Sequence, residues 1–383
     1  MTAYLDNAAT TQVCPEAAAA AMKMMTEVYG NPSSTHTMGR EAKAVLEASR
    51  ASVARALGGK AEEVFFTSCG SESDNWALRS SAELLHRKGK HIISSTVEHS
   101  AVLKSLDILE KQGYTVTRLH PEADGSISPD AVKNALREDT ILVSLMLVNN
   151  ETGAVTDIPA IAKLLKASGS PALLHTDAVQ GFLKIPFSVK TLGADMVSVS
   201  GHKIHAPKGI GALWVKGGVK TIRLAPLIAG GLQEGGRRAG TEALPNIAAF
   251  AAACDAGKTA FAESYAHEKA LRALAVSRLT AENEGLRVLS PDDAAPGILS
   301  ISLPGYRSET LMNALEVSGI FVSKSSACKK GHRSYVLEEL GLPADVIDGT
   351  IRISFSRFTT EDEVNWFCDE LCRVRKSVYT KLH

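Results

Sequence analysis

The feature that most constrains the fold of this 383-residue chain is an alternation of strand-like and helix-like segments between about residues 15 and 255. Segments with helical spacing of apolar residues separate short strand-like runs, for example at 64–67, 91–95, 140–148 and 172–176. Such alternation is typical of parallel strands joined by crossover helices. The longest run is apolar on both of its faces, as expected where helices cover both sides of a sheet. The sequence therefore predicts a large α/β domain.

A second, smaller α+β domain is predicted after this region. A long helical pattern at 247–283 leads into a strand-like run at 297–303, a helix at 308–318 and a strand at 350–355. No low-complexity linker separates the two parts, so the boundary rests on the change of pattern alone. We assign residues 14–255 to the large domain, and residues 1–13 and 256–383 to the small one.

Charge and cysteine usage exclude several classes of protein. Lys plus Arg and Asp plus Glu both number 42, so no net charge attracts nucleic acid or an anionic membrane. The chain has no secretory signal pattern and no uninterrupted apolar stretch of about 18 residues, which predicts a cytoplasmic protein outside the membrane. Six scattered cysteines without CxxC spacing predict reduced thiols and no metal site: Cys14, Cys69, Cys254, Cys328, Cys368 and Cys372.

One lysine is the first candidate for chemistry. An alternating strand from Asp195 runs into a tight Ser-Gly turn that presents Lys203. Burial beside a cofactor lowers the pKa of an amine, and a neutral lysine can form a Schiff base. The alternative is an ordinary solvated loop lysine, which is common after a strand.

Other polar residues also follow predicted strands. The turn at Gly70 and Ser71 opens a helix whose free N–H groups can hold a phosphate, although Ser71 can equally be a simple N-cap. Asp177 can pair with a protonated pyridine nitrogen or cap the next helix. His99 can be a catalytic residue that stacks on a planar cofactor while exchanging protons, or it can be structural. Asn150 can bind a ligand or form a turn. Because the carboxyl ends of parallel strands meet at one sheet edge, these residues predict one site.

The motifs in which these residues stand resemble those of the cysteine desulfurases. The likeness covers nearly the whole chain, with the motifs in family order at residues 7–11, 67–75, 98–99, 149–153, 177–180, 200–203 and 238–242. Cysteine desulfurases belong to the class V aminotransferase group of fold-type I pyridoxal-phosphate enzymes. The resemblance implies a mostly parallel seven-stranded sheet sandwiched by helices, a smaller α+β domain and bound pyridoxal 5'-phosphate.

By position, the resemblance implies how the cofactor ring is held. Lys203 would be the Schiff-base lysine, and Asp177 would pair with the pyridinium nitrogen. Gln180 would donate to the phenolic oxygen, while His99 would stack on the ring. Asn150 would contact both the cofactor and the substrate carboxylate.

The resemblance also assigns the phosphate site. Gly70, Ser71, Ser200 and His202 would hold the phosphate within one subunit. Thr241 matches a residue that is donated to the same phosphate across a dimer interface. The family pattern therefore implies a homodimer with two composite sites.

The remaining matched residues imply the reaction. Arg352 would clamp the carboxylate of L-cysteine, and Cys328 would take its sulfur as a persulfide, leaving L-alanine. Sulfur would then pass to an acceptor, either an iron–sulfur scaffold protein or a tRNA-thiolation enzyme. Lys329, Lys330 and Arg333 favour the thiolate of Cys328.

Three alternatives and two departures qualify this assignment. The alternatives are a selenocysteine lyase, a class V aminotransferase, and an idle sulfur carrier that keeps the cofactor as structural support. Cys328 separates a desulfurase from an aminotransferase, because transamination needs no thiol at that position. Cys69 stands where the family usually has glycine, and the segment after Cys328 is short and basic, which puts acceptor choice and loop reach in question.

Overall fold

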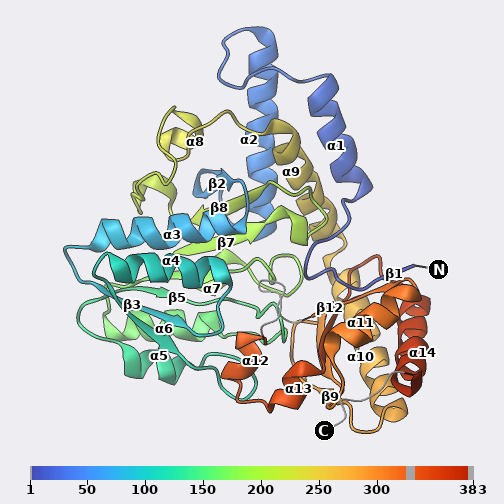
Figure 1. The fold of residues 1–383 in the computed structure, drawn as a ribbon. Helices are drawn as coiled ribbons and strands as arrows, with labels where there is room; N and C mark the ends of the chain where they lie inside the picture. Colours follow the sequence, from blue (N-terminus) through green and yellow to red (C-terminus); the bar gives the residue numbers. More distant parts are fainter. Residues whose placement is uncertain (1, 325–332, 378–383) are drawn as a thin grey trace.

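A mostly parallel sheet forms the centre of the protein in the computed structural model, which describes residues 2–324 and 333–377 (Figure 1). Within these ranges the large sheet has seven strands in the order β2-β8-β7-β6-β5-β3-β4. Neighbours are parallel except where β8 runs antiparallel to β2 and β7. The predicted fold class is confirmed. The strands are β2 (Val64–Thr67), β3 (His91–Ser95), β4 (Thr115–Leu119), β5 (Thr140–Ser144), β6 (Leu173–Asp177), β7 (Met196–Ser200) and β8 (Gly211–Val215).

Helices cover both faces of this sheet. Helices α3 (Gly70–Leu85) and α4 (Ser100–Lys111) lie together on one face, and α3 contacts β5 to β8. Leu142 of β5 is buried in the same cluster as Trp76 of α3, whereas its neighbour Val143 packs with Ile161 on the other side. Both faces of the strand are therefore apolar, as predicted. The other face is covered by α5 (Pro129–Ala135), α6 (Ile158–Ser168) and α7 (Val189–Leu192).

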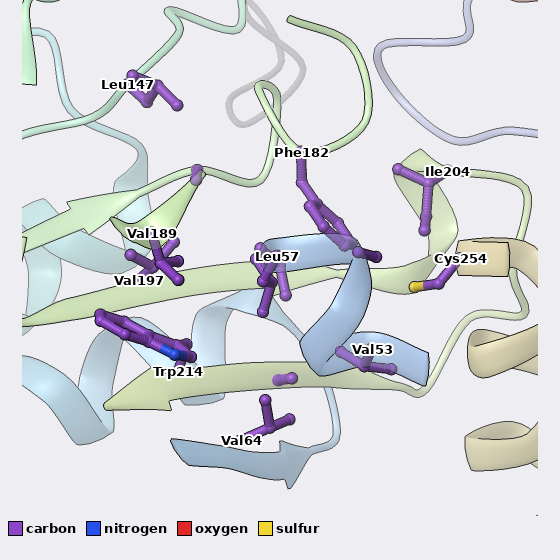
Figure 2. Packing of buried hydrophobic residues seen from close by; sticks show 14 of the residues in the cluster. Val53, Leu57, Val64, Leu147, Phe182, Val189, Val197, Ile204, Trp214 and Cys254 are labelled. Carbon is purple, nitrogen blue, oxygen red and sulfur yellow. The ribbon is translucent and has the colours of Figure 1, made fainter. Parts of the chain in front are cut away.

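Three further helices pack beside the sheet. They are α1 (Pro15–Thr26), α2 (Thr37–Leu57) and α9 (Leu244–Thr259), and both α1 and α2 contact α9. Figure 2 shows Val53 and Leu57 of α2 within the core, with Phe182 pointing toward the end of this helix. The short α8 (Gln233–Gly236) is interrupted by left-handed backbone at Glu234 and Gly235.

A small antiparallel sheet forms a second layer. Its order is β12-β13-β10-β9, and α10 (Phe261–Glu282), α11 (Ser308–Val317) and α14 (Glu361–Ser377) supply residues to its core. The N-terminal strand pairs with β11, and Asp6 bridges to Ser354 of β13. The remaining elements are β1 (Ala3–Tyr4), β9 (Arg287–Val288), β10 (Ile298–Ser302), β11 (Ile320–Phe321), β12 (Ser323–Lys324), β13 (Thr350–Ser354), α12 (Tyr335–Glu339) and α13 (Ala344–Asp348).

Two predicted boundaries are wrong. The strand predicted at 140–148 ends at Ser144, and the chain continues in irregular structure to Asn149. The helical pattern at 247–283 is split into α9 and α10 at Ala260, whose ψ of 2° leaves the helical region. Apolar residues recur at helical spacing on both sides of this break, so periodicity could not reveal it.

The division into two domains at residues 13 and 255 stays a prediction. Over the described ranges, no helix combines the length and the apolar character needed to cross a membrane.

Candidate active site

The predicted site residues meet around one cavity of about 830 Å³. It opens where β3, β5, β6 and β7 end, as expected for an open α/β sheet. Thr241 is exposed and is not among the residues that line the cavity. Cys328 lies outside the described residues. The lining includes Gly70, Ser71, His99, Asn150, Asp177, Gln180, Ser200, His202, Lys203 and Arg352.

Lys203 has the environment of a reactive amine. It ends a short 3-10 turn directly after β7, and its Nζ donates to the carbonyls of Ala8 at 2.5 Å and Ala9 at 2.7 Å. Burial, followed by the positive charges of Lys184 and Arg352, lowers the pKa of Lys203 to about 7. A large fraction of the amine is therefore neutral near neutral pH, which a lysine nucleophile requires.

Asp177 is a buried carboxylate at the end of β6. Its Oδ1 accepts a hydrogen bond from the backbone N–H of Val179 at 2.9 Å. Burial raises the pKa of Asp177, while the neighbouring His99 and Lys203 oppose that shift. A cationic ring nitrogen beside Asp177 would favour its charged form in the same way.

A second buried carboxyl group, Asp74 of α3, stands next to Asp177. One side-chain atom from each of Asp74, Asp177 and His99 lies within 4.8 Å of the other two. Burial, and then the charge of Asp177, raise the pKa of Asp74 well above its usual range. Two carboxylates this close in a buried place cannot both be ionised at low cost, so Asp74 holds the proton.

His99 is fixed by the start of α4. Its Nδ1 accepts a hydrogen bond from the N–H of Ala101 at 3.2 Å, so His99 is the N-cap of this helix. An accepting Nδ1 places the ring proton on Nε2 of the neutral imidazole. The ring is thus oriented by its own backbone while it lines the cavity.

The start of α3 offers free backbone donors. The helix begins at Gly70 with Cys69 at its N-cap, and the Cys69 side chain makes no capping hydrogen bond. Ser71 is therefore inside the helix, so its interpretation as an N-cap is wrong. A Cβ at Gly70 would come within 2.7 Å of the Val179 side chain, which leaves little room for any other residue. Uncapped N–H groups at a helix start suit a phosphate.

Ser200 and His202 line the same cavity, and Ser200 lies beside Gly70 at this helix start. Within the described residues, the buried Oγ of Ser200 has no hydrogen-bond partner. Burial lowers the pKa of His202 to about 4, so the ring is neutral, and its Nδ1 lies 3.3 Å from Oγ1 of Thr10. A neutral ring nitrogen and a free hydroxyl are suitable partners for an anion's oxygens.

Arg352 brings the small sheet into the site. Its Nη1 donates to the carbonyl of Asn150 at 2.7 Å, and its Nη2 pairs with Asp6 at 3.0 Å. Nε of Arg352 and Oδ1 of Asn150 are buried without a partner in the described part of the chain. Because buried polar atoms are normally paired, the donors Nε of Arg352 and Oγ of Ser200 fit a ligand with anionic groups, and the acceptor Oδ1 of Asn150 fits a hydrogen-bond donor on such a ligand. The residues present therefore fit pyridoxal phosphate and an amino-acid carboxylate.

Several charged residues of the site are missed by sequence reasoning. Burial raises the pKa of Glu98 to about 8 and that of Glu151 to about 7, and Glu151 accepts a hydrogen bond from Ser334. The motifs name Glu98 and Glu151 only as neighbours of His99 and Asn150. Lys184 is missed entirely, although it stands four residues after Gln180.

Comparisons with known proteins agree with this geometry. The family model "Aminotransferase class-V" matches residues 3–367. The protein named cysteine desulfurase 2 of Trichormus variabilis is 42% identical over 365 residues, which cover 94% of this chain and 90% of the relative. A solved structure named NifS-like protein superposes with a TM-score of 0.93 at 36% identity, covering 99% of this chain and all of that one.

A further solved structure, titled "SspA in complex with cysteine", has a TM-score of 0.82 at 30% identity and covers 94% of this chain and all of that one. Family match, identity and fold agree over almost the full length of the chain. The protein therefore belongs to the cysteine desulfurases of the class V aminotransferase family, whose members are in general pyridoxal-phosphate enzymes.

Proposed function

We propose that this protein binds pyridoxal 5'-phosphate at Lys203 and removes sulfur from L-cysteine, giving L-alanine and a persulfide on Cys328. The single observation that carries the proposal is one cavity that combines a lysine of lowered pKa, a buried carboxylate and a buried arginine. These are Lys203, Asp177 and Arg352. They supply an amine nucleophile, a partner for a ring cation and a partner for a substrate carboxylate.

Bound pyridoxal phosphate would supply a ring that accepts the charge left when the substrate loses its α-proton. The residues of this chain position and protonate the reacting groups. Arg352 would hold the substrate carboxylate through its buried Nε–H donor, which has no protein partner in the described part of the chain, and Asn150 would orient the same carboxylate through its amide N–H group. Asp177 would stabilise the positive ring nitrogen. Once released by the substrate amine, Lys203 would take the α-proton on its Nζ, for which a pKa of about 7 is well suited.

The sulfur step is assigned to Cys328. Its thiolate would attack the substrate sulfur, forming an S–S bond while the carbon–sulfur bond breaks. The electron pair of that bond stays with the carbon skeleton, which is protonated to L-alanine. The sulfur is thereby held as a persulfide and can pass to an acceptor protein, either an iron–sulfur scaffold or a tRNA-thiolation enzyme. Such transfer between thiols favours a reducing compartment, the cytoplasm.

We further propose a homodimer in which Thr241 contributes to the partner's phosphate site. Thr241 is exposed, as its role across an interface requires. Helix α1 also exposes Met22 by 60% and Met25 by 58%, and Tyr29, which follows the end of this helix, is exposed by 67%. Met22 and Met25 are three residues apart and so lie on one face of the helix, and exposed apolar residues that gather on one face mark interaction surfaces.

The deciding experiment is incubation of the purified yellow protein with L-cysteine and a reductant, while sulfide and alanine are measured. We expect equal amounts of both from the wild type and neither from Cys328→Ala. Absence of sulfide from a wild type that retains its cofactor would refute desulfuration of L-cysteine. Selenocysteine and amino-transfer substrates would then be tested in the same assay.

A further inference from the structure

A strained turn places Lys184 behind Lys203. After β6 the chain makes a turn in which the Phe182 N–H donates to the Ala178 carbonyl at 2.8 Å. Leu183 has a φ of +55°, a conformation that costs a residue with a Cβ about 1–3 kcal/mol unless its surroundings enforce it. Phe182 supplies such an anchor, because it points into the large core (Figure 2). Its ring packs edge-on against that of Phe250, with the ring centroids 6.4 Å apart.

The strained turn directs the Lys184 ammonium into polar surroundings. Its Nζ donates to Oε1 of Gln180 at 3.1 Å. A small cavity of about 30 Å³ beside it can hold roughly one water molecule. Burial lowers the pKa of Lys184 to about 8, whereas the negative charge of Glu268 on α10 opposes that shift. The charged and titratable groups that act on Lys184 or line this cavity are Lys203, His205, Glu268, Arg352 and Arg357.

The ammonium group determines which way the Gln180 amide faces. A lysine ammonium can only donate, so the amide oxygen must point to Lys184. The amide nitrogen then points the other way and donates to the Ala8 carbonyl at 2.8 Å. A reversed amide would set two donors against each other at Lys184 and two acceptors against each other at Ala8.

The Ala8 carbonyl joins this amide to the reactive amine. It accepts from Nε2 of Gln180 at 2.8 Å and from Nζ of Lys203 at 2.5 Å. A continuous hydrogen-bonded chain therefore runs from Lys184 through Gln180 and Ala8 to Lys203. An amide nitrogen has two N–H donors, and the Ala8 carbonyl uses one of them. The other can serve a ligand in the cavity, which Gln180 lines.

We propose that Lys184 is a positioning residue, which fixes the Gln180 amide so that its nitrogen serves the cofactor pocket and which places a positive charge behind Lys203. The inference rests on the proposed function, because Gln180 touches a cofactor only if one binds at Lys203. Apart from burial, the charge of Lys184 is the largest influence that lowers the pKa of Lys203. Arg352 acts in the same direction, and Asp6 and Asp177 oppose it.

The test compares Lys184→Met, which removes donor and charge, with Lys184→Arg, which keeps both. Lys190→Met is the matched control, because Lys190 is an exposed lysine on α7. The readouts are the affinity of each apoprotein for pyridoxal phosphate, measured by absorbance, and the pH midpoint of the absorbance of the bound cofactor. Lys184→Met should weaken binding about tenfold, the effect of one hydrogen bond to a charged group. Its midpoint should rise by roughly one pH unit, because a nearby positive charge is lost.

Epistasis separates positioning from a purely structural role. Gln180→Ala should weaken cofactor binding by itself, and adding Lys184→Met should weaken it no further. The arginine variant and the Lys190 control should match the wild type in both readouts. The inference would be overturned if Lys184→Met had the same cofactor affinity and the same pH midpoint as the wild type. Additive losses of affinity in the double variant would also overturn it, as would a folded Lys184→Arg variant that behaves like Lys184→Met.

The methionine variant removes one of the two cations, Lys184 and Arg357, that favour the charged form of the buried Glu268, so it can lose stability. The double variant Lys184→Met with Glu268→Gln removes both charges and keeps the test valid if the single variant fails to fold. The same absorbance change must be abolished by Lys203→Ala. If the wild-type protein bound no pyridoxal phosphate, the proposed function would fail. If the wild type bound it normally and Lys184→Met bound it equally well, only the positioning role of Lys184 would be refuted.

Discussion

Replacing Arg50 with leucine should lower the free energy of unfolding by about 3–5 kcal/mol, because it leaves the buried Glu234 carboxylate without its charged partner. Arg50 on α2 and Glu234 are both more than 90% buried. Nη1 and Nη2 of Arg50 donate to the two carboxylate oxygens at 2.6 and 2.8 Å, and Nη1 also donates to the Val64 carbonyl at 2.9 Å. The N–H of Phe66 donates to the same carboxylate at 3.0 Å.

The magnitude depends on what each variant leaves behind. Arg50→Leu leaves Glu234 charged with only the Phe66 N–H as a partner from this network. The double variant Arg50→Leu with Glu234→Leu removes both charges, so it should cost less than Arg50→Leu alone. Arg55→Leu is a matched control one turn along α2. Its ion pair with Asp255 is exposed by more than half on both sides, and such pairs contribute at most about 1 kcal/mol.

The assay is equilibrium unfolding in urea of the cofactor-free protein at one fixed protein concentration, since subunit association would change the apparent stability. A cost below about 1 kcal/mol for Arg50→Leu, or a double variant that loses the sum of both single changes, would refute this reasoning. Glu234 has a left-handed φ of +48° in the glycine-rich segment that leads to Thr241. Arg50→Leu should therefore also weaken pyridoxal phosphate binding if Thr241 reaches the partner's phosphate.

Three further outcomes are expected. Arg352→Lys should raise the KM for L-cysteine roughly tenfold or more in steady-state kinetics, because lysine cannot form a bidentate pair with a carboxylate; an unchanged KM would place the substrate carboxylate elsewhere. Met25→Glu should shift the protein toward monomer in sedimentation experiments, and an unchanged mass would remove α1 from the interface. Burial raises the pKa of Glu98 to about 8, so the folded protein retains this proton between about pH 4.5 and pH 8 while the unfolded chain has lost it. Stability should then fall by up to about 1.4 kcal/mol per pH unit across that window, and Glu98→Gln should flatten the urea-unfolding profile by that amount; parallel profiles would contradict it.

Strand periodicity predicted the sheet well because the burial of a strand follows its local sequence. The runs at 64–67 and 91–95 are β2 and β3 with the predicted bounds. The segment after Ser144 remains as apolar as the strand before it, so its departure from the sheet leaves no mark on the pattern. Tertiary hydrogen bonds decide that boundary, for example from the Leu147 N–H to the Asp177 carbonyl.

The residues at strand ends were predictable because parallel strands present their carboxyl ends at one edge. The buried charged residues that surround the site were not predictable from the sequence. Lys184 depends on the left-handed backbone at Leu183, and a leucine gives no local signal for positive φ. Asp74 stands in a helix start where an exposed capping role is common, and only the packing of α3 against β6 and β7 buries it beside Asp177.

These buried charges explain how the site can move protons near neutral pH. Burial disfavours every charged form, so it raises the pKa of acids and lowers the pKa of bases. The pKa values of Lys203 and Glu151 are both about 7, and those of Lys184 and Glu98 are both about 8. The ordinary pKa values of these acids and bases lie several units apart, and burial brings them to nearly equal values. Proton transfer is most efficient between groups whose pKa values are similar. The burial that lowers the pKa of Lys203 therefore also raises the pKa of Glu151, which lines the same cavity.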